Sequence, residues 1–160
     1  MNDSILDLPD DIKEALMSVK VKFNGQTKQF IVRDELVIDY DNIEKDMEEF
    51  PNKFHMWAML YSEIKEQREV LDKKIRKRKG IIYKGIQEVD GGKNLRRSDI
   101  SDLMETDDVL ENLEAQMIIT EKQCQKLWFT LESLRMKNDN MRSLSGFKKQ
   151  ELFQASQSNS

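Results

Sequence analysis

The chain has 160 residues, of which 26 are Lys or Arg and 30 are Asp or Glu, so its formal net charge is −4. Only 38% of its residues are hydrophobic and 35% are charged, whereas a globular domain averages about 45–50% apolar and about 25% charged residues. This composition argues against a compact enzyme with a deep pocket and favours long helices or a coiled coil.

The small net charge conceals blocks of opposite sign. Residues 1–64 hold 7 basic and 14 acidic side chains, and residues 65–97 hold 12 basic and 5 acidic ones. Residues 98–121 hold 8 acidic side chains and no basic one, and residues 122–153 hold 7 basic and 3 acidic ones. Because salt screens charges beyond roughly 8–10 Å, these local blocks matter more for partners than the total does.

The N-terminal region combines a helix start with a β-hairpin. Pro9, followed by two aspartates, predicts a short helix. Residues 19–32 alternate apolar and polar side chains around Asn24-Gly25, and this pattern is the strongest local signal for a hairpin. A lone hairpin is marginally stable in water, so we expect it to pack on helices or on another copy, with a flexible segment as the alternative.

A first long helix is expected after Pro51, which should end a short helix over residues 41–50. Apolar residues then recur at helical spacing from Phe54 to Ile75, which predicts a helix from residue 52 to about residue 79. Glycines from Gly80 onward predict a connection of roughly 20 residues.

A second long helix carries a regular apolar seam. Side chains alternate three and four residues apart from Leu103 to Met141, which is the pattern of a coiled coil. We expect this seam to support self-association through Leu110, Leu113, Met117, Leu127, Leu131 and Leu134. Residues 143–146 should end the helix, residues 147–153 should form a short amphipathic helix, and residues 154–160 should be a disordered tail.

The predicted fold is therefore mainly α: a long antiparallel helical hairpin or coiled coil with a small N-terminal β-hairpin and a short C-terminal helix. Residues 1–37 form an N-terminal extension, residues 38–153 a helical domain and residues 154–160 a tail. The aromatic residues and two apolar stripes exceed what one hairpin can enclose, so we expect an oligomer.

Catalytic and metal-binding motifs are absent from the sequence, so we expect no enzyme, no metal and no cofactor. His55 has no partner residues nearby in the sequence, and Cys124 falls on the apolar seam, where a small buried side chain is expected. A single cysteine, no apolar run of roughly 18 residues and no signal-peptide pattern favour a cytoplasmic protein without membrane contact.

A basic cluster at the end of the first helix is the most informative feature. Its density of like charge exceeds what capping of a helix end needs and indicates an anionic partner, with nucleic acid the leading candidate. Tyr83 would offer a stacking face for an unpaired base. The candidate DNA-binding residues are Lys73, Lys74, Arg76, Lys77, Arg78, Lys79, Tyr83 and Lys84, with a second patch of Arg142, Lys148 and Lys149. Charge alone leaves a second reading open, in which the basic cluster pairs with the acidic block 98–121 within or between chains.

The order of several short motifs resembles the UvsY family of bacteriophage recombination mediators over roughly residues 38–153. The matching motifs are Ile38-Asp39, Phe50-Pro51, Phe54-His55, Tyr61, a basic helix ending in Tyr83-Lys84-Gly85, the acidic stretch 100–108, residues 131–134, Met141-Arg142 and residues 148–153. The N-terminal extension 1–37 and the pair Ile82-Tyr83, where the family often has two tyrosines, depart from that pattern.

This resemblance implies a non-enzymatic protein that binds single-stranded DNA and assembles into a ring-like homo-oligomer. Such a mediator helps a RecA-type recombinase displace single-strand-binding protein, in the host cytoplasm if a phage encodes it. The resemblance places DNA contact at Lys77 and Lys79 and assembly at Phe147, Leu152 and Phe153. The alternative is a structural coiled-coil scaffold or assembly chaperone whose charge blocks pair between subunits.

Overall fold

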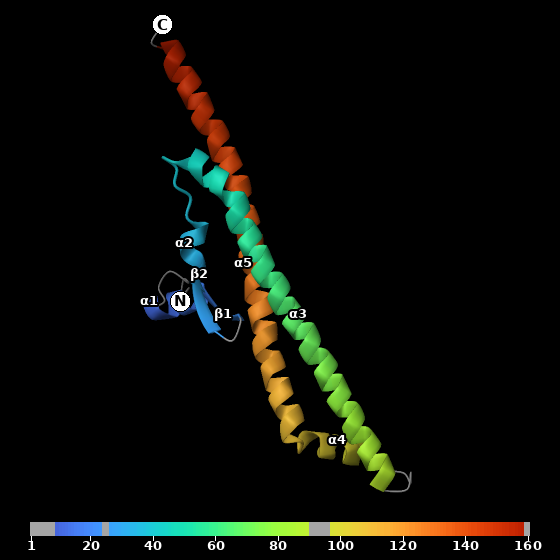
Figure 1. Cartoon of the computed structure of the whole chain (residues 1–160). Coiled ribbons are helices and arrows are strands. Elements are labelled where there is room, and N and C mark those ends of the chain that lie inside the picture. Colours follow the sequence, from blue (N-terminus) through green and yellow to red (C-terminus); the bar gives the residue numbers. More distant parts are fainter. Residues whose placement is uncertain (1–8, 24–25, 90–96, 159–160) are drawn as a thin grey trace. The chain divides into compact units, whose positions relative to one another are not determined.

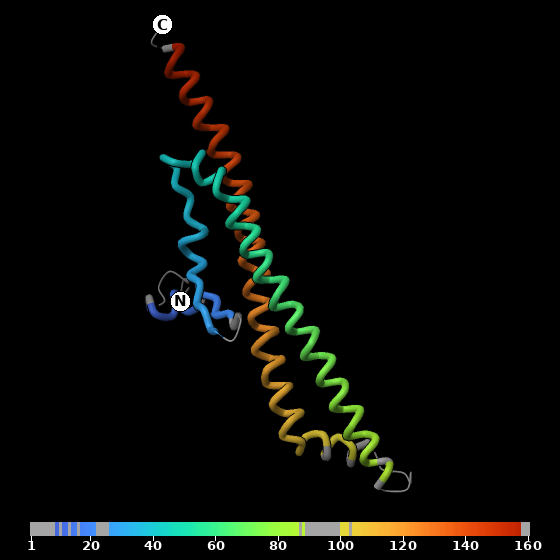
Figure 2. The backbone as a smooth tube through the Cα atoms, viewed as in Figure 1, coloured from blue at the N-terminus to red at the C-terminus, as the bar shows by residue number. Residues whose placement is uncertain are grey.

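The computed structural model describes residues 9–23, 26–89 and 97–158, and most of them are helical. The chain forms two compact units: the first combines Met1–Tyr61 with Gln125–Ser160, and the second is Ser62–Cys124. Helices α3 (Ile43–Val89) and α5 (Asp108–Ser158) contribute to both units and run antiparallel beside each other within each (Figures 1 and 2). The predicted mainly helical class, with a long helical hairpin and a small N-terminal sheet, is confirmed.

The N-terminal part of the first unit contains the predicted short helix and β-hairpin. Helix α1 (Asp10–Leu16) leads into β1 (Ser18–Phe23) and β2 (Gln26–Ile31), and α2 (Val32–Leu36) follows directly (Figure 1). The strands are antiparallel, in a register that runs from Ser18 opposite Ile31 to Phe23 opposite Gln26. The predicted turn residues 24–25 lie outside the described residues.

The hairpin packs on helices, as its small size requires. Val19 and Val21 alternate onto one face of β1 and are 2% and 0% exposed. Phe30 on β2 meets Trp57 on α3 edge to face, with ring centroids 5.6 Å apart. The aromatic contact and the buried valines bind the N-terminal segment into the first unit.

Three lysines on α5 also hold the N-terminal segment. Lys126, Lys137 and Lys148 are spaced 11 residues apart, which is close to three helical turns, so they lie in one row. Their ammonium groups donate to main-chain carbonyls: Lys126 to Ala15 and Ser18 at 3.3 and 3.2 Å, Lys137 to Glu35 at 3.0 Å, and Lys148 to Tyr40 and Asp41 at 3.3 and 3.0 Å. Since Ala15 and Glu35 lie in the last turns of α1 and α2, two of these lysines neutralise helix C-termini. We call this row the lysine ladder.

The core of each unit lies between α3 and α5. In the first unit the most deeply buried large side chains are Ile43, Trp57, Leu127, Leu134 and Met141, each at most 1% exposed. In the second unit Ile64, Ile75 and Leu110 are buried. Full burial of one such side chain contributes about 1.5–3 kcal/mol, which explains why the seam of α5 faces inward.

Helix α3 is longer than predicted at both ends. Pro51 lies inside the helix and does not end it, so the expected boundary is wrong. Proline removes a main-chain hydrogen bond to Met47 and costs about 3 kcal/mol, a cost that burial of Trp57 and Ile64 offsets. The helix also continues through Gly80 and Gly85 to Val89, where a connection was expected.

Helix α5 begins and ends later than predicted. A short helix α4 (Arg97–Glu105) precedes it, and residues 106–107 between the two helices are not helical. The seam positions Leu103 and Thr106 therefore lie before α5. The side chain of Asp107 caps α5, because the Leu110 N–H donates to its Oδ1 at 2.7 Å.

The C-terminal part of α5 also differs from the prediction. The helix passes through Gly146 without interruption, so the expected separate helix over residues 147–153 is wrong. Residues 154–158 continue the helix where a disordered tail was expected. Buried Met141 and Ser145 keep the inner face of α5 packed up to this point, so one interior glycine, at about 1 kcal/mol, is not enough to end the helix.

Candidate nucleic-acid interface

The basic cluster lies in the second unit, on the part of α3 where opposite sides of the helix have different environments. Ile75 is buried and faces α5, whereas Lys73 and Lys77 are exposed. Residues at i, i+4 and i+11 share one side of an α-helix, which places Lys84 with these two lysines on the outer side. The cluster therefore has an inner and an outer part.

Arg78 belongs to the inner part and is engaged within the chain. Its Nε donates to Asp107 Oδ1 at 3.0 Å and its terminal nitrogen donates to Asp107 Oδ2 at 2.5 Å, which is the strong two-point geometry of an arginine–carboxylate pair. This hydrogen bonding by Arg78, together with the Leu110 N–H, lowers the pKa of Asp107 below its ordinary value. The same contact raises the pKa of Arg78. Arg78 thus fixes the start of α5 against α3.

Two more cations of the cluster have acidic partners. Lys79 pairs with Glu114 on α5 at 2.7 Å, and Arg76 pairs with Asp72 one turn earlier on α3 at 2.5 Å. Nearby, Arg68 lies 3.8 Å from Glu121. The acidic block 98–121 therefore pairs with part of the basic cluster inside one chain, through Asp107 and Glu114.

Four lysines of the cluster form the outer part: Lys73, Lys74, Lys77 and Lys84. All four are exposed, and none has an ion-pair partner among residues 9–23, 26–89 and 97–158. We call them the exposed lysine set. Of the two positions that the resemblance singles out, Lys77 belongs to this set and Lys79 is paired.

Tyr83 lies on α3 beside these lysines and is 45% exposed, so part of its side chain is accessible. Ile81 is 50% exposed, whereas Ile82 is half-buried. An exposed aromatic ring beside unpaired lysines is the combination that proteins use to bind unpaired nucleic-acid strands.

The second predicted patch lies in the first unit, and one of its three cations is engaged within the chain. Arg142 and Lys149 are exposed on α5, and neither has an ion-pair partner among the described residues. Lys148 is engaged by the main-chain carbonyls of the lysine ladder, and its ammonium lies 5.7 Å from the centre of the Tyr40 ring. Two cations of this patch therefore remain for an external anion.

The predicted assembly residues divide into two groups. Seam residues pack within the chain: Leu110, Leu127, Leu131 and Leu134 are buried, and Leu113 and Met117 are half-buried. By contrast, Phe147, Leu152 and Phe153 are 60–64% exposed on the last turns of α5. The second group therefore presents the larger apolar surface outside the core.

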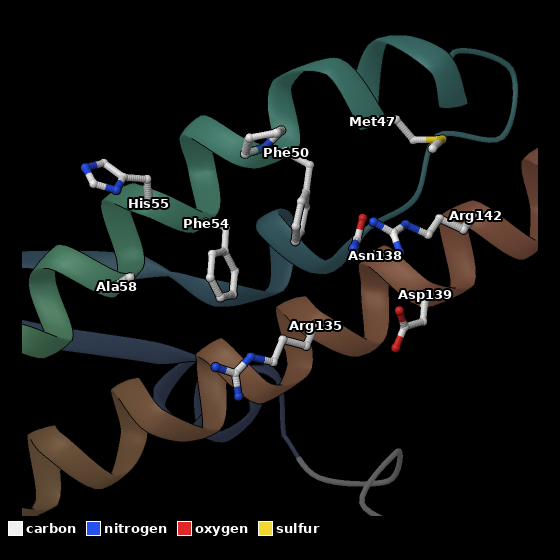
Figure 3. Close-up of a pocket in the computed structure, with 10 residues that line it drawn as sticks. Met47, Phe50, Phe54, His55, Ala58, Arg135, Asn138, Asp139 and Arg142 are labelled. Atoms are coloured by element: carbon white, nitrogen blue, oxygen red, sulfur yellow. The ribbon is translucent and has the colours of Figure 1, made fainter.

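An open groove of about 800 Å³ in the first unit was not predicted (Figure 3). Phe50 and Phe54 extend into it from α3, and Arg135, Asn138 and Arg142 reach it from α5 (Figure 3). On each helix these residues are three or four positions apart, which places them on one side of the helix, and this spacing is the sequence signal for the groove. The groove was not predicted because Pro51 was expected to separate Phe50 and Phe54 into two helices.

No group of His, Cys, Asp and Glu suited to hold a metal occurs among the residues that the structure describes. Cys124 is buried between the helices of the second unit, and this burial raises the pKa of its thiol. In the described part of the chain, no helix has both the length and the apolar character that crossing a bilayer requires.

The chain was also compared with known proteins. No protein-family model, no curated protein and no solved structure matches it.

Proposed function

We propose that this chain is a non-enzymatic mediator of DNA recombination that binds single-stranded DNA. The observation that carries the proposal is the exposed lysine set: these four lysines on one stretch of α3 have no acidic partner in the described part of the chain, although Arg76, Arg78 and Lys79 beside them are paired. Lysines that approach phosphates release counterions, which supplies most of the affinity of a sequence-independent nucleic-acid site.

Single-stranded DNA is favoured over duplex DNA by the exposed ring of Tyr83. Bases in a duplex are stacked on one another, whereas an unpaired base can stack on an aromatic side chain. The resemblance to the UvsY family, which rests on residues 38–153, supports the same ligand.

Self-association would strengthen this weak site. Phe147, Leu152 and Phe153 expose apolar surface on the last turns of α5, where it is available for contact with further copies. In a ring-like homo-oligomer, one DNA strand would meet several exposed lysine sets, and each later contact would form at high effective concentration.

The mediator role is tested by a reconstituted loading assay. Single-stranded DNA coated with single-strand-binding protein is mixed with a RecA-type recombinase, and DNA-dependent ATP hydrolysis by the recombinase is followed over time. The wild-type chain should shorten the lag before hydrolysis, and a Lys73→Glu, Lys77→Glu variant should not. Lys122→Glu changes one exposed lysine outside the cluster and serves as the control.

A coiled-coil scaffold remains the competing function, and light scattering distinguishes it. If the oligomer dissociates at high salt and no single-stranded DNA binds at low salt, charge pairing between subunits is the role of the blocks and the mediator proposal fails. Pairing of Arg78 and Lys79 inside the chain favours the mediator, because these cations are already satisfied without a second subunit.

A further inference from the structure

The groove of the first unit brings together aromatic rings and guanidinium groups. The Phe50 and Phe54 rings lie 5.8 Å apart and are tilted by 30° to each other. The guanidinium carbon of Arg135 lies 5.9 Å from the centre of the Phe54 ring. Both rings are half-buried, so each keeps part of its surface open to the groove.

Polar groups along α5 complete the lining. Arg135 pairs with Glu132 on the same helix, whereas Arg142 is exposed and has no ion-pair partner among the described residues. Asn138 lies between them on the groove side of α5 and presents one amide that can both donate and accept hydrogen bonds (Figure 3). Asp139 lines the same groove.

We propose that this groove receives an unpaired base of single-stranded DNA, with a neighbouring phosphate on Arg142. The inference rests on the proposed function and adds to it a base-binding site that is separate from the exposed lysine set. The base stacks on the ring surface of Phe54 and on the guanidinium plane of Arg135, and Asn138 bonds to its polar edge.

The chemistry of the groove favours a base over an acidic protein segment. Among the described residues, Arg142 is the one arginine of the lining without an ion-pair partner, so the groove suits a single phosphate beside an uncharged base better than the several carboxylates of such a segment. Flat ring faces and one amide suit a flat ligand with a polar edge. Duplex DNA cannot place a base in the groove without unstacking it, so this site would select single strands.

The test compares two fluorescein-labelled strands of about 15 nucleotides, one of thymidines and one of abasic residues with the same phosphates. Fluorescence anisotropy measures both affinities for the full chain, and the ratio between them reports base contact. The Phe54→Leu variant keeps an apolar side chain and removes the ring. Its matched control is Phe129→Leu, which removes a 54% exposed ring on α5 outside the groove.

Each stacked base contributes about 5- to 150-fold, so the wild-type chain should bind the thymidine strand at least about fivefold more tightly than the abasic strand. Phe54→Leu should lower this ratio at least about fivefold and leave the salt dependence unchanged. Arg142→Gln should lower the logarithmic salt slope by about 0.7, the contribution of one phosphate. If circular dichroism shows that Phe54→Leu is unfolded, Ala58→Met fills the groove instead and should lower the ratio in the same way.

Three results would overturn the inference, and they separate it from the proposed function. If Lys77→Gln weakens binding while Phe54→Leu and Ala58→Met leave the ratio unchanged, the exposed lysine set binds DNA and the groove does not. If the wild-type chain binds neither strand, both proposals fail. If the groove variants weaken only a labelled peptide of alternating Asp and Phe, the groove binds an acidic protein segment.

Discussion

Replacing the exposed lysine set with glutamine should remove much of the salt dependence of single-stranded DNA binding. Lys73, Lys74, Lys77 and Lys84 are the cations of the cluster without acidic partners in the described part of the chain. Glutamine removes the charge and keeps a good helix former, so α3 should remain intact.

The expected size of the effect follows from the number of these lysines. Each phosphate contact on a single strand contributes about 0.7 to the slope of log affinity against log salt concentration, so four contacts contribute about 2.8. Between about 50 and about 200 mM salt, a slope of 2.8 corresponds to an affinity loss of about 50-fold. Over this range, the factor by which salt weakens binding should therefore be about 50-fold smaller for the quadruple variant than for the wild-type chain.

Anisotropy titrations at several salt concentrations provide the measurement, and single variants provide the controls. Lys77→Gln should lower the slope by about 0.7. Lys122→Gln removes one exposed charge from α5 outside the set and should leave the slope unchanged. Lys79→Gln should change the slope less than Lys77→Gln does, because Lys79 already pairs with Glu114.

Two results would refute this reasoning. A quadruple variant with the wild-type slope would show that these lysines do not contact phosphates. Equal slopes for Lys77→Gln and Lys122→Gln would show that only the total charge matters, and not the place of each lysine on α3.

Three further predictions concern stability. Lys137→Met should lower the free energy of unfolding by about 2 kcal/mol, because it removes a charged hydrogen bond from a side chain that is only 6% exposed. Urea unfolding followed by circular dichroism measures this loss. An equal loss in the exposed-site variant Lys149→Met would contradict the role of the lysine ladder. Asp107 has a lowered pKa, chiefly through its hydrogen bond with Arg78, so it stabilises the folded chain at neutral pH. This stability is lost as the pH falls below 3.8, the ordinary pKa of an aspartate, and through the lowered pKa. Asp107→Asn should flatten this part of the curve of unfolding free energy against pH, and an unchanged curve would exclude the contribution. Gly80→Ala should raise the free energy of unfolding by up to about 1 kcal/mol, because alanine is the better helix former and an added Cβ meets nothing within 4 Å. A lower midpoint of urea unfolding would show that this position needs glycine.

Secondary structure was predictable where the local signal agreed with the packing. The alternation around Asn24-Gly25 predicted the strands, and the seam from Leu110 to Met141 predicted the buried side of α5. Helix boundaries were less predictable, because Pro51 and Gly146 are local signals of about 1–3 kcal/mol that burial of neighbouring side chains can outweigh.

The candidate site was predictable only in part. The sequence shows that residues 73–79 are densely basic, but it does not show which of these residues have partners. Asp107 lies 29 residues from Arg78, and the distance closes only when α5 packs against α3 within the second unit. The groove beside Phe54 likewise depends on two helices meeting.

The sequence by itself determined the helical class, the hairpin and the opposed charge blocks, because helical and strand periodicities and charge are local properties of neighbouring residues. Only the tertiary structure decided which charges are satisfied. Packing of α5 against α3 neutralises Arg78 and leaves Lys77 exposed, and packing of the N-terminal segment on α5 engages Lys148. Partnering depends on distances between residues far apart in the chain, and these distances exist only in the folded protein.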